Sequence, residues 1–323
     1  MTIQPFVKDG KVMENSTGYR QVISTLTAIA SQVSKQKFYK IPIADYMPVL
    51  VGKSGYSLDI LNWRTFSDGE DFDTGIIGNA GNKNKIQEVD ATLDSVSQIV
   101  YPWAKGISYT IFQVEQAALA GNFFSLIEAK EVSRKTNWDL GIQKKAFFGY
   151  GDSKGLLNQA GATTNTTTIT KRLNGMTAAE LNSFVGAILG VYRTNCNYTA
   201  YPTHFVIPET DWNGLGQFPD ATYPLKSRLA ILEETFRVMT MNPNFKILPL
   251  AYCDKANFDE TNNIYLLYNS DPTSLKFDIP LDYQMSTTAS INGFQWANVA
   301  WGSFAPLALL RPKELMYFTN TAT

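Results

Sequence analysis

Residues 111–158 read IFQVEQAALAGNFFSLIEAKEVSRKTNWDLGIQKKAFFGYGDSKGLLN, and this stretch decides the fold. Apolar residues recur in it at mixed steps of three and four with charged residues between them, namely Phe123, Leu126, Ile127, Val132, Trp138, Leu140 and Ile142. This period predicts a helix with one stripe facing a core. With Asn122 as its N-cap, a helix over residues 122–148 would span roughly 40 Å at about 1.5 Å per residue, long enough to be the spine of the fold.

The end of the predicted helix carries a distinctive order of aromatic and small residues. Residues 147–151 read FFGYG, and Gly155, Leu156, Leu157 and Asn158 follow within a few positions. A spine helix with this ending resembles the major capsid proteins of tailed phages of the Hong Kong 97 type. The resemblance implies an α+β fold with an N-terminal arm, a long extended β-hairpin loop, a peripheral domain with a spine helix and long strands, and an axial domain.

The same resemblance divides the chain into five parts. They are an N-terminal arm (1–45), a peripheral-domain strand with the extended hairpin loop (46–110), the peripheral domain with its spine helix (111–175), an axial domain (176–270) and the closing strands of the peripheral domain (271–323).

The composition favours a protein that covers its surface with copies of itself. Hydrophobic residues make up 44% and aromatic residues 13% of the 323 positions, whereas charged residues, at 18%, fall below the usual quarter. Interface cores are depleted of charge and enriched in aromatic residues. A large monomer with a big core explains the same numbers. The net charge of -1 and the absence of a dense basic run argue against a protein that reads nucleic-acid sequence, but they allow the lining of a DNA container.

Residues for catalysis, cofactors or metal binding are scarce in the sequence. The single histidine, His204, lies in an apolar strand and is expected to be a hydrogen-bonded core imidazole. Cys196 and Cys253 are far apart and are expected to be two reduced thiols. Residues 149–151 lack the third glycine of a dinucleotide-binding loop. The sequence therefore predicts no enzyme, no cofactor and no metal site, and without an apolar run of about 20 residues or a signal peptide it predicts a soluble chain made in a cytoplasm.

The N-terminal region contains a short apolar period. Val22, Leu26, Ile29 and Val33 repeat behind a Ser-Thr pair, which predicts a short amphipathic helix. This helix either packs on its own domain or, as the resemblance implies, belongs to an arm that lies on a neighbouring subunit.

Residues 56–110 alternate with period two around a turn-rich piece at residues 67–85, which predicts a long hairpin. Because an isolated two-stranded ribbon is at best marginally stable in water, it should lie on something. Its tip carries acidic and basic clusters that could pair across a subunit boundary, and the resemblance makes it the extended loop that overlaps the adjacent subunit. A calcium loop is the alternative for the acidic cluster, but the spacing of its acids differs from that of an EF-hand.

The second half of the chain alternates helix and strand. Thr177 and Glu180 form a capping-box pair ahead of a helix that reaches residue 192. Further helices are predicted at 209–215 and 227–236, and strands at 203–207, 246–250 and 263–268. Strands at 275–280, 295–302 and 309–312 are expected to return and pair with the base of the hairpin, and residues 311–318 resemble the family's C-terminal strand.

The main hypothesis is a structural major capsid protein that assembles as pentamers and hexamers into the icosahedral head of a tailed double-stranded DNA phage. Its partners would be itself, the portal, scaffolding and decoration proteins and non-specifically packaged DNA, with no membrane; it would be located in the virion after assembly in the bacterial host cytoplasm. The predicted subunit-contact residues are Trp63, Arg64, Phe66, Asp71, Asp73, Lys83, Lys85, Glu131, Arg134, Lys135 and Trp138. The alternatives are an encapsulin-like nanocompartment shell and a monomeric α+β enzyme or binding protein.

Overall fold

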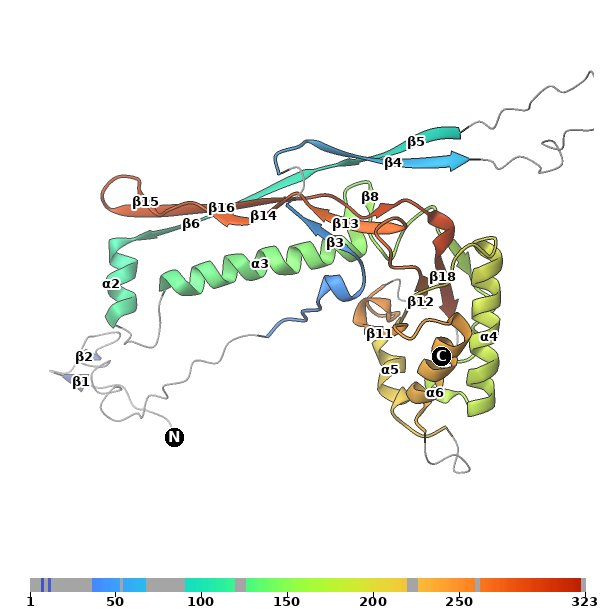
Figure 1. The fold of residues 1–323 in the computed structure, drawn as a ribbon. Helices are drawn as coiled ribbons and strands as arrows, with labels where there is room; N and C mark the ends of the chain where they lie inside the picture. Colours follow the sequence, from blue (N-terminus) through green and yellow to red (C-terminus); the bar gives the residue numbers. More distant parts are fainter. Residues whose placement is uncertain are drawn as a thin grey trace, which may run out of the picture. The chain divides into compact units, whose positions relative to one another are not determined.

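The computed structural model describes residues 7–8, 11–12, 37–52, 55–67, 91–119, 126–219, 226–258 and 262–320 (Figure 1). The predicted amphipathic helix around residues 22–33, the N-cap at Asn122 and the tip of the hairpin lie outside the described residues.

The chain divides into two compact units. The first contains residues 1–39, 107–134 and 288–298, and the second contains residues 40–106, 135–287 and 299–323. Three elements contribute residues to both units, namely β6 (Tyr101–Thr110), α3 (Leu126–Phe148) and β16 (Gln295–Phe304).

The first unit contains α2 (Ile111–Leu119), the beginning of α3, and β15 (Ala289–Ser290), which pairs antiparallel with β16. It also contains the short antiparallel pair β1 (Val7–Lys8) and β2 (Lys11–Val12). The start of α2 is fixed to the turn before β16, because the backbone N–H of Ile111 donates to the carbonyl of Phe294 at 3.2 Å and the Phe112 ring meets the Phe294 ring edge-on at 5.3 Å.

The second unit is built around a five-stranded sheet with the order β11-β10-β12-β18-β9. These strands are β11 (Lys246–Leu250), β10 (His204–Pro208), β12 (Asn263–Tyr268), β18 (Leu315–Asn320) and β9 (Thr163–Asn165). The β10-β11 and β18-β9 pairs are parallel, and the two inner pairs are antiparallel. A mixed sheet with flanking helices confirms the predicted α+β class.

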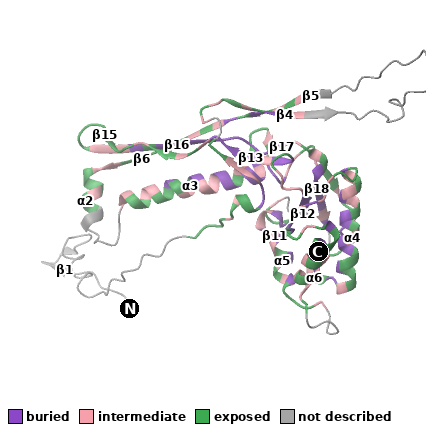
Figure 2. Ribbon diagram, viewed as in Figure 1, coloured by how far each residue is buried: buried purple, intermediate pink, exposed green. Residues whose placement is uncertain are grey.

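The strands β10, β12 and β18 of this sheet are buried on both faces, which explains why they are nearly continuous apolar runs rather than alternating ones. On one face Tyr265 and Leu267 of β12 pack in a cluster with α4 (Ala178–Asn195), α5 (Glu209–Leu215) and α6 (Arg228–Thr240). On the other face Ile264 and Leu266 pack in a cluster with Phe147 from the end of α3. Figure 2 shows buried residues gathered on β12, β18 and the sheet-facing side of α4.

The glycine-rich segment after α3 turns the chain back on the helix end. β7 (Gly149–Tyr150) pairs with β8 (Ser153–Lys154), and the N–H of Leu156 donates to the carbonyl of Ala146 at 3.0 Å. Gly149 has φ +81°, the left-handed region that favours glycine at a helix C-terminus. Asn158 then clamps the turn, because its Oδ1 accepts from Gly155 N at 2.7 Å and its Nδ2 donates to Phe148 O at 3.0 Å.

Several predicted elements are confirmed. The Thr177–Glu180 capping box opens α4, where Thr177 Oγ1 accepts from Glu180 N and the Glu180 carboxylate accepts from Thr177 N. The strands β10, β11 and β12 and the helices α5 and α6 lie where they were expected.

The short 3₁₀ turns are η1 (Ile43–Asp45), η3 (Leu173–Gly175), η4 (Ala251–Cys253) and η5 (Pro312–Glu314).

Of the closing strands, only β16 pairs with a strand of the predicted hairpin region 56–110, namely β6, and the expected pairing is wrong for the others. β13 (Leu275–Ile279) pairs with β3 (Val49–Val51) and β17 (Ala308–Leu309), while β16 pairs with β6, β14 (Leu281–Met285) and β15. Among the described residues the hairpin strands β4 (Asp59–Ser67) and β5 (Ala91–Ile99) pair with each other alone. β18 pairs with β12 of the predicted axial region, while the predicted domain boundaries themselves stay a prediction.

Candidate assembly surface

Strands β4 and β5 form a two-stranded antiparallel ribbon in the second unit, with Asp59 opposite Ile99 and Ser67 opposite Ala91. Arg64 and Asp94 are directly opposed, and the guanidinium approaches the carboxylate to 2.5 Å. The hydrogen bond from Arg64 is the main reason why the pKa of Asp94 lies below its usual value. A cross-strand ion pair of this kind helps to fix the register of the ribbon.

The root of the ribbon is attached to the body of the second unit through its inner face. Asn62 lies opposite Val96 and Gln98 lies opposite Ile60, so Asn62 and Gln98 are diagonal neighbours across the ribbon. Both are buried, and Asn62 Nδ2 donates to Gln98 Oε1 at 2.7 Å. The Gln98 side chain in turn donates to the carbonyl of Pro306. Because successive side chains of a strand alternate in direction, this attachment turns the neighbouring residues outward.

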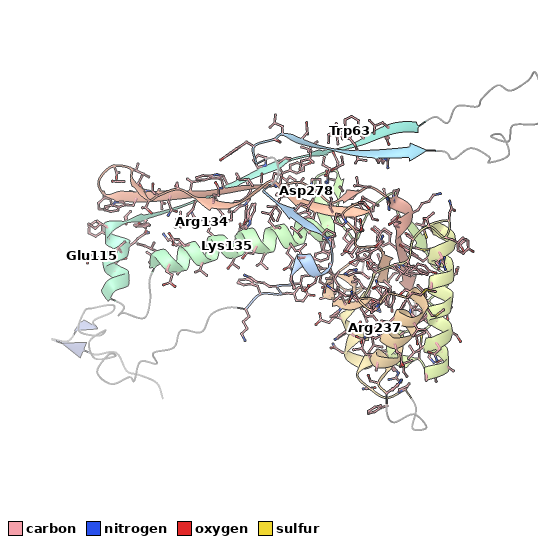
Figure 3. The ribbon with its side chains drawn as sticks, viewed as in Figure 1. Trp63, Glu115, Arg134, Lys135, Arg237 and Asp278 are labelled. Carbon is pink, nitrogen blue, oxygen red and sulfur yellow. The ribbon has the colours of Figure 1, made fainter. Side chains whose placement is uncertain are left out.

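The outer face of the ribbon exposes four large apolar side chains. Leu61, Trp63, Leu93 and Ile99 keep 48%, 59%, 57% and 56% of their surface accessible, and Figure 3 shows Trp63 on β4. Burying one such side chain fully contributes about 1.5–3 kcal/mol, and a ribbon without further strands is marginal in water. Covering this face with another protein surface would therefore strongly stabilise the ribbon.

The remaining predicted hairpin residues are placed only in part. Phe66 lies within β4, but its side chain is not among those described. Asp71, Asp73, Lys83 and Lys85 lie outside the described residues.

On α3, two predicted contact residues of the first unit meet at Asn298 of β16. The Arg134 side chain is 2% exposed, and its guanidinium donates to Asn298 Oδ1 at 2.7 Å and to the Asn298 carbonyl at 3.2 Å. Asn298 Nδ2 donates to Glu131 Oε1 at 3.4 Å. This arrangement ties α3 to β16. The sequence prediction missed Asn298, because its partner on the helix lies 164 positions away in the sequence and no local pattern reports the contact.

The other two α3 residues belong to the second unit and differ in exposure. Lys135 is half-exposed, forms an ion pair with Asp139 at 2.9 Å and lies over the Tyr283 ring. Trp138 is only 4% exposed and packs against Trp103 with ring centroids 5.0 Å apart. Trp138 therefore supports the interior of its own subunit, whereas Lys135 lies at the surface.

The side chains considered for chemistry occupy structural positions. His204 stacks on Tyr268, and its Nδ1 lies 2.8 Å from Thr203 Oγ1. Burial, with a smaller effect of Lys246, lowers the pKa of His204 to about 4. Cys196 and Cys253 are free and buried. Within the described ranges no cluster of three potential metal-binding residues occurs, and none of the helices described there is long and apolar enough to cross a membrane.

A comparison with protein-family models matches residues 74–320 to the family described as Major capsid protein. The chain belongs to this family. The major capsid protein described here is accordingly a structural protein of the virion that assembles with copies of itself, and not an enzyme.

Solved capsid structures share the fold of this major capsid protein. The capsid of Myoviridae phage XM1 is similar at 15% identity and a TM-score of 0.73, over 92% of this chain and 97% of that chain. A Gordonia phage Cozz structure is similar at 12% identity and a TM-score of 0.57, over 100% and 99%. A comparison with curated proteins gives no match.

A virus-like particle from Pyrococcus furiosus is also similar, at 11% identity and a TM-score of 0.52, over 86% of this chain and 92% of that chain. The likeness of fold therefore extends to a virus-like particle as well as to the phage structures. The family match, rather than the fold, assigns this chain to the major capsid proteins.

Proposed function

We propose that this major capsid protein assembles as hexamers and pentamers into the icosahedral head of a tailed double-stranded DNA phage, with the outer face of the β4-β5 ribbon covered by a neighbouring copy. The exposed apolar face of Leu61, Trp63, Leu93 and Ile99 is the observation that carries the proposal. Repeating this contact around a closed shell adds many modest interactions through multivalency.

The proposal keeps all the predicted contact residues, but the structure describes them to different extents. Trp63 and Arg64 belong to the ribbon, and the roles of Phe66, Asp71, Asp73, Lys83 and Lys85 in subunit contacts remain predictions. The same holds for the α3 residues, of which Glu131 and Lys135 are nearer the surface than the buried Arg134 and Trp138.

The remaining features of the proposal follow from the family. The portal, scaffolding and decoration proteins are proposed partners. Packaged DNA is proposed to be held without sequence preference, since the net charge of -1 and the lack of a dense basic run in the sequence argue against reading of nucleic-acid sequence. Assembly is proposed to take place in the bacterial host cytoplasm. The five-part division into arm, hairpin, spine, axial domain and closing strands is proposed on the same ground.

The test is to express the chain and examine the product by size-exclusion chromatography and negative-stain electron microscopy. Closed shells are expected from the full chain, and deletion of residues 68–85 should leave folded subunits that no longer form shells. A small monodisperse species from the full chain would contradict the proposal. Particles that protect double-stranded DNA from nuclease support a phage head, whereas particles filled with protein cargo and no DNA would favour a nanocompartment.

A further inference from the structure

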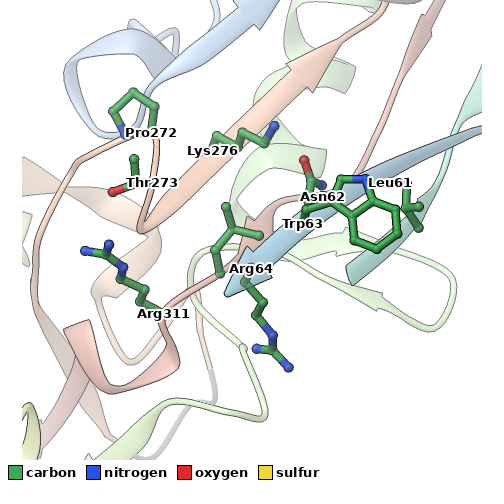
Figure 4. Close-up of a pocket in the computed structure, with 9 residues that line it drawn as sticks. Leu61, Asn62, Trp63, Arg64, Pro272, Thr273, Lys276 and Arg311 are labelled. Atoms are coloured by element: carbon green, nitrogen blue, oxygen red, sulfur yellow. The ribbon is translucent and has the colours of Figure 1, made fainter. Parts of the chain in front are cut away.

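A cavity of about 360 Å³, here called the root cavity, lies beside the root of the ribbon in the second unit (Figure 4). It is lined by four consecutive residues of β4 and by two segments from the end of the chain, namely Leu61, Asn62, Trp63, Arg64, Pro272, Thr273, Lys276, Leu310 and Arg311. The sequence prediction missed it because these three segments are far apart in the sequence and carry no shared motif.

The lining of the root cavity is basic. Arg64, Lys276 and Arg311 contribute three cationic groups, and none of the nine lining residues is acidic. The exposed indole of Trp63 stands beside them. Such a lining suits a segment that brings carboxylates together with an apolar or aromatic side chain.

The cationic groups are held in position by carboxylates of the same subunit. Lys276 Nζ lies 3.7 Å from the buried carboxylate of Asp278, and Arg311 lies 3.2 Å from the buried carboxylate of Glu314. Arg311 is itself more than half exposed. An arginine has five N–H donors and a lysine three, so a single carboxylate does not use up the donors of Arg311 or Lys276. The cavity is thus preorganised to accept further carboxylate oxygens.

The densest acidic run of the chain is at residues 68–73, DGEDFD, which contains four acids and no base. Phe72, the fifth residue of the run, provides an aromatic ring for the neighbourhood of Trp63, and aromatic rings attract one another in offset or edge-to-face arrangements. The charge and composition of this run therefore complement the root cavity.

Residues 68–73 fit the root cavity of another copy better than the root cavity of their own subunit. β4 continues for three residues beyond Arg64 and ends at Ser67, which carries the chain about 10 Å along the strand at roughly 3.3 Å per residue. To reach its own cavity, the run would have to turn back along β4. We infer that residues 68–73 of a second copy seat in the root cavity, with their carboxylates on Lys276 and Arg311; this inference rests on the proposed function.

A disulfide trap tests the contact directly. Wild-type particles are collected first, and their failure to form would contradict the proposed function rather than this inference. Particles carrying Thr273→Cys with Asp71→Cys are then oxidised and run on a denaturing non-reducing gel. A ladder of covalently linked subunits is expected, since Cys196 and Cys253 are buried and do not compete.

The matched control places the second cysteine on the exposed surface of α4, as Ser183→Cys with Asp71→Cys. The control should stay monomeric on the gel. A monomer band or a fast-migrating intrachain product from the Thr273→Cys particles would overturn the inference, and so would an equal ladder from the control.

Charge reversal provides a second measurement. Lys276→Glu with Arg311→Glu in one chain, and Asp71→Lys with Asp73→Lys in another, should each lower the shell yield at least tenfold. Mixing the two variants should restore shells, because each altered run then meets an altered cavity and each native run meets a native one. Loss of yield that mixing does not restore, with both variants folded by circular dichroism, contradicts the inference.

Discussion

Trp138 of α3 packs directly on the backbone of Gly302 in β16: a Cβ atom added at residue 302 would lie 2.5 Å from Cη2 of the indole. The two residues lie in the second unit and join the spine helix to the long closing strand. A side chain at residue 302 would push the ring out of its site against Trp103 and Tyr283.

Gly302→Ala is therefore expected to lower the free energy of unfolding by about 1–3 kcal/mol, the usual cost of overpacking. Denaturant unfolding of unassembled subunits measures the change. Gly141→Ala on α3, where a Cβ meets nothing within 4 Å, should instead stabilise by about 0.5–1 kcal/mol, as alanine does in a helix. The double variant Gly302→Ala with Trp138→Phe should lose less unfolding free energy than the sum of the losses in the two single variants. Strictly additive losses would rule out direct contact between the two residues.

The bond between Arg134 and Asn298 leads to a second prediction. Asn298→Ala removes the side-chain acceptor at 2.7 Å from the buried guanidinium, and a hydrogen bond to a charged group contributes about 1.5–3 kcal/mol. Urea denaturation should show this loss. Ser133→Ala, at the exposed position next to Arg134, should change the stability by less than about 0.5 kcal/mol. Equal effects of the two changes would refute a special role for Asn298.

Sequence patterns predicted helices and strands well where the residues that determine them are close together in the sequence. The capping box at Thr177 and Glu180 lies within four residues of sequence, and α4 begins there as predicted. The run at 263–268 predicted a buried strand, and β12 is buried throughout. The pairing of β12 with β18 was not predictable, because it depends on complementary packing of both sheet faces and not on any signal within either strand.

The assembly surface was only partly predictable, because only some of its features have a local sequence signal. Alternation around Trp63 and Arg64 predicted a ribbon, and the structure has one. Period and composition do not say which helix residues face the subunit's own core, so Arg134 and Trp138 were predicted as contacts although both are buried. The root cavity joins three distant segments and had no sequence signal.

The glycine at position 155 leads to a third prediction. A Cβ atom there would lie 2.3 Å from the carbonyl carbon of Phe147 and 2.5 Å from Phe148 N, both of them backbone atoms at the end of α3. Because backbone cannot move aside as a flexible side chain does, Gly155→Ala should destabilise the subunit by about 3 kcal/mol or more. Thermal unfolding checks this. Gly216→Ala, with open space around the added Cβ, is the matched control and should be close to neutral.

The single histidine predicts a defined pH dependence. Burial lowers the pKa of His204 to about 4, below the value of about 6.5 expected in the unfolded chain. The unfolded state therefore binds the proton first, so the stability contributed by neutral His204 is fully present above pH 6.5 and is lost as the pH falls towards 4. His204→Gln should flatten the unfolding free energy across this window in denaturant titrations. An unchanged slope would show that other groups cause the pH dependence.

The exposed indole of Trp63 yields the prediction that bears most directly on assembly. Trp63→Ser removes the largest apolar side chain of the outer ribbon face, and buried aromatic anchors at interfaces often contribute 2 kcal/mol or more. The subunit concentration needed for shell formation should therefore rise more than about tenfold, since 1.4 kcal/mol corresponds to a factor of ten. Light scattering during assembly measures this threshold.

Because Trp63 is exposed in the subunit, the free energy of unfolding of the unassembled Trp63→Ser variant should change by less than about 0.5 kcal/mol. Ser95→Ala, directly across the ribbon from Trp63, should leave the threshold unchanged, and Trp63→Phe should keep most of the assembly. A normal threshold for Trp63→Ser would mean that the ribbon face stays uncovered in the shell.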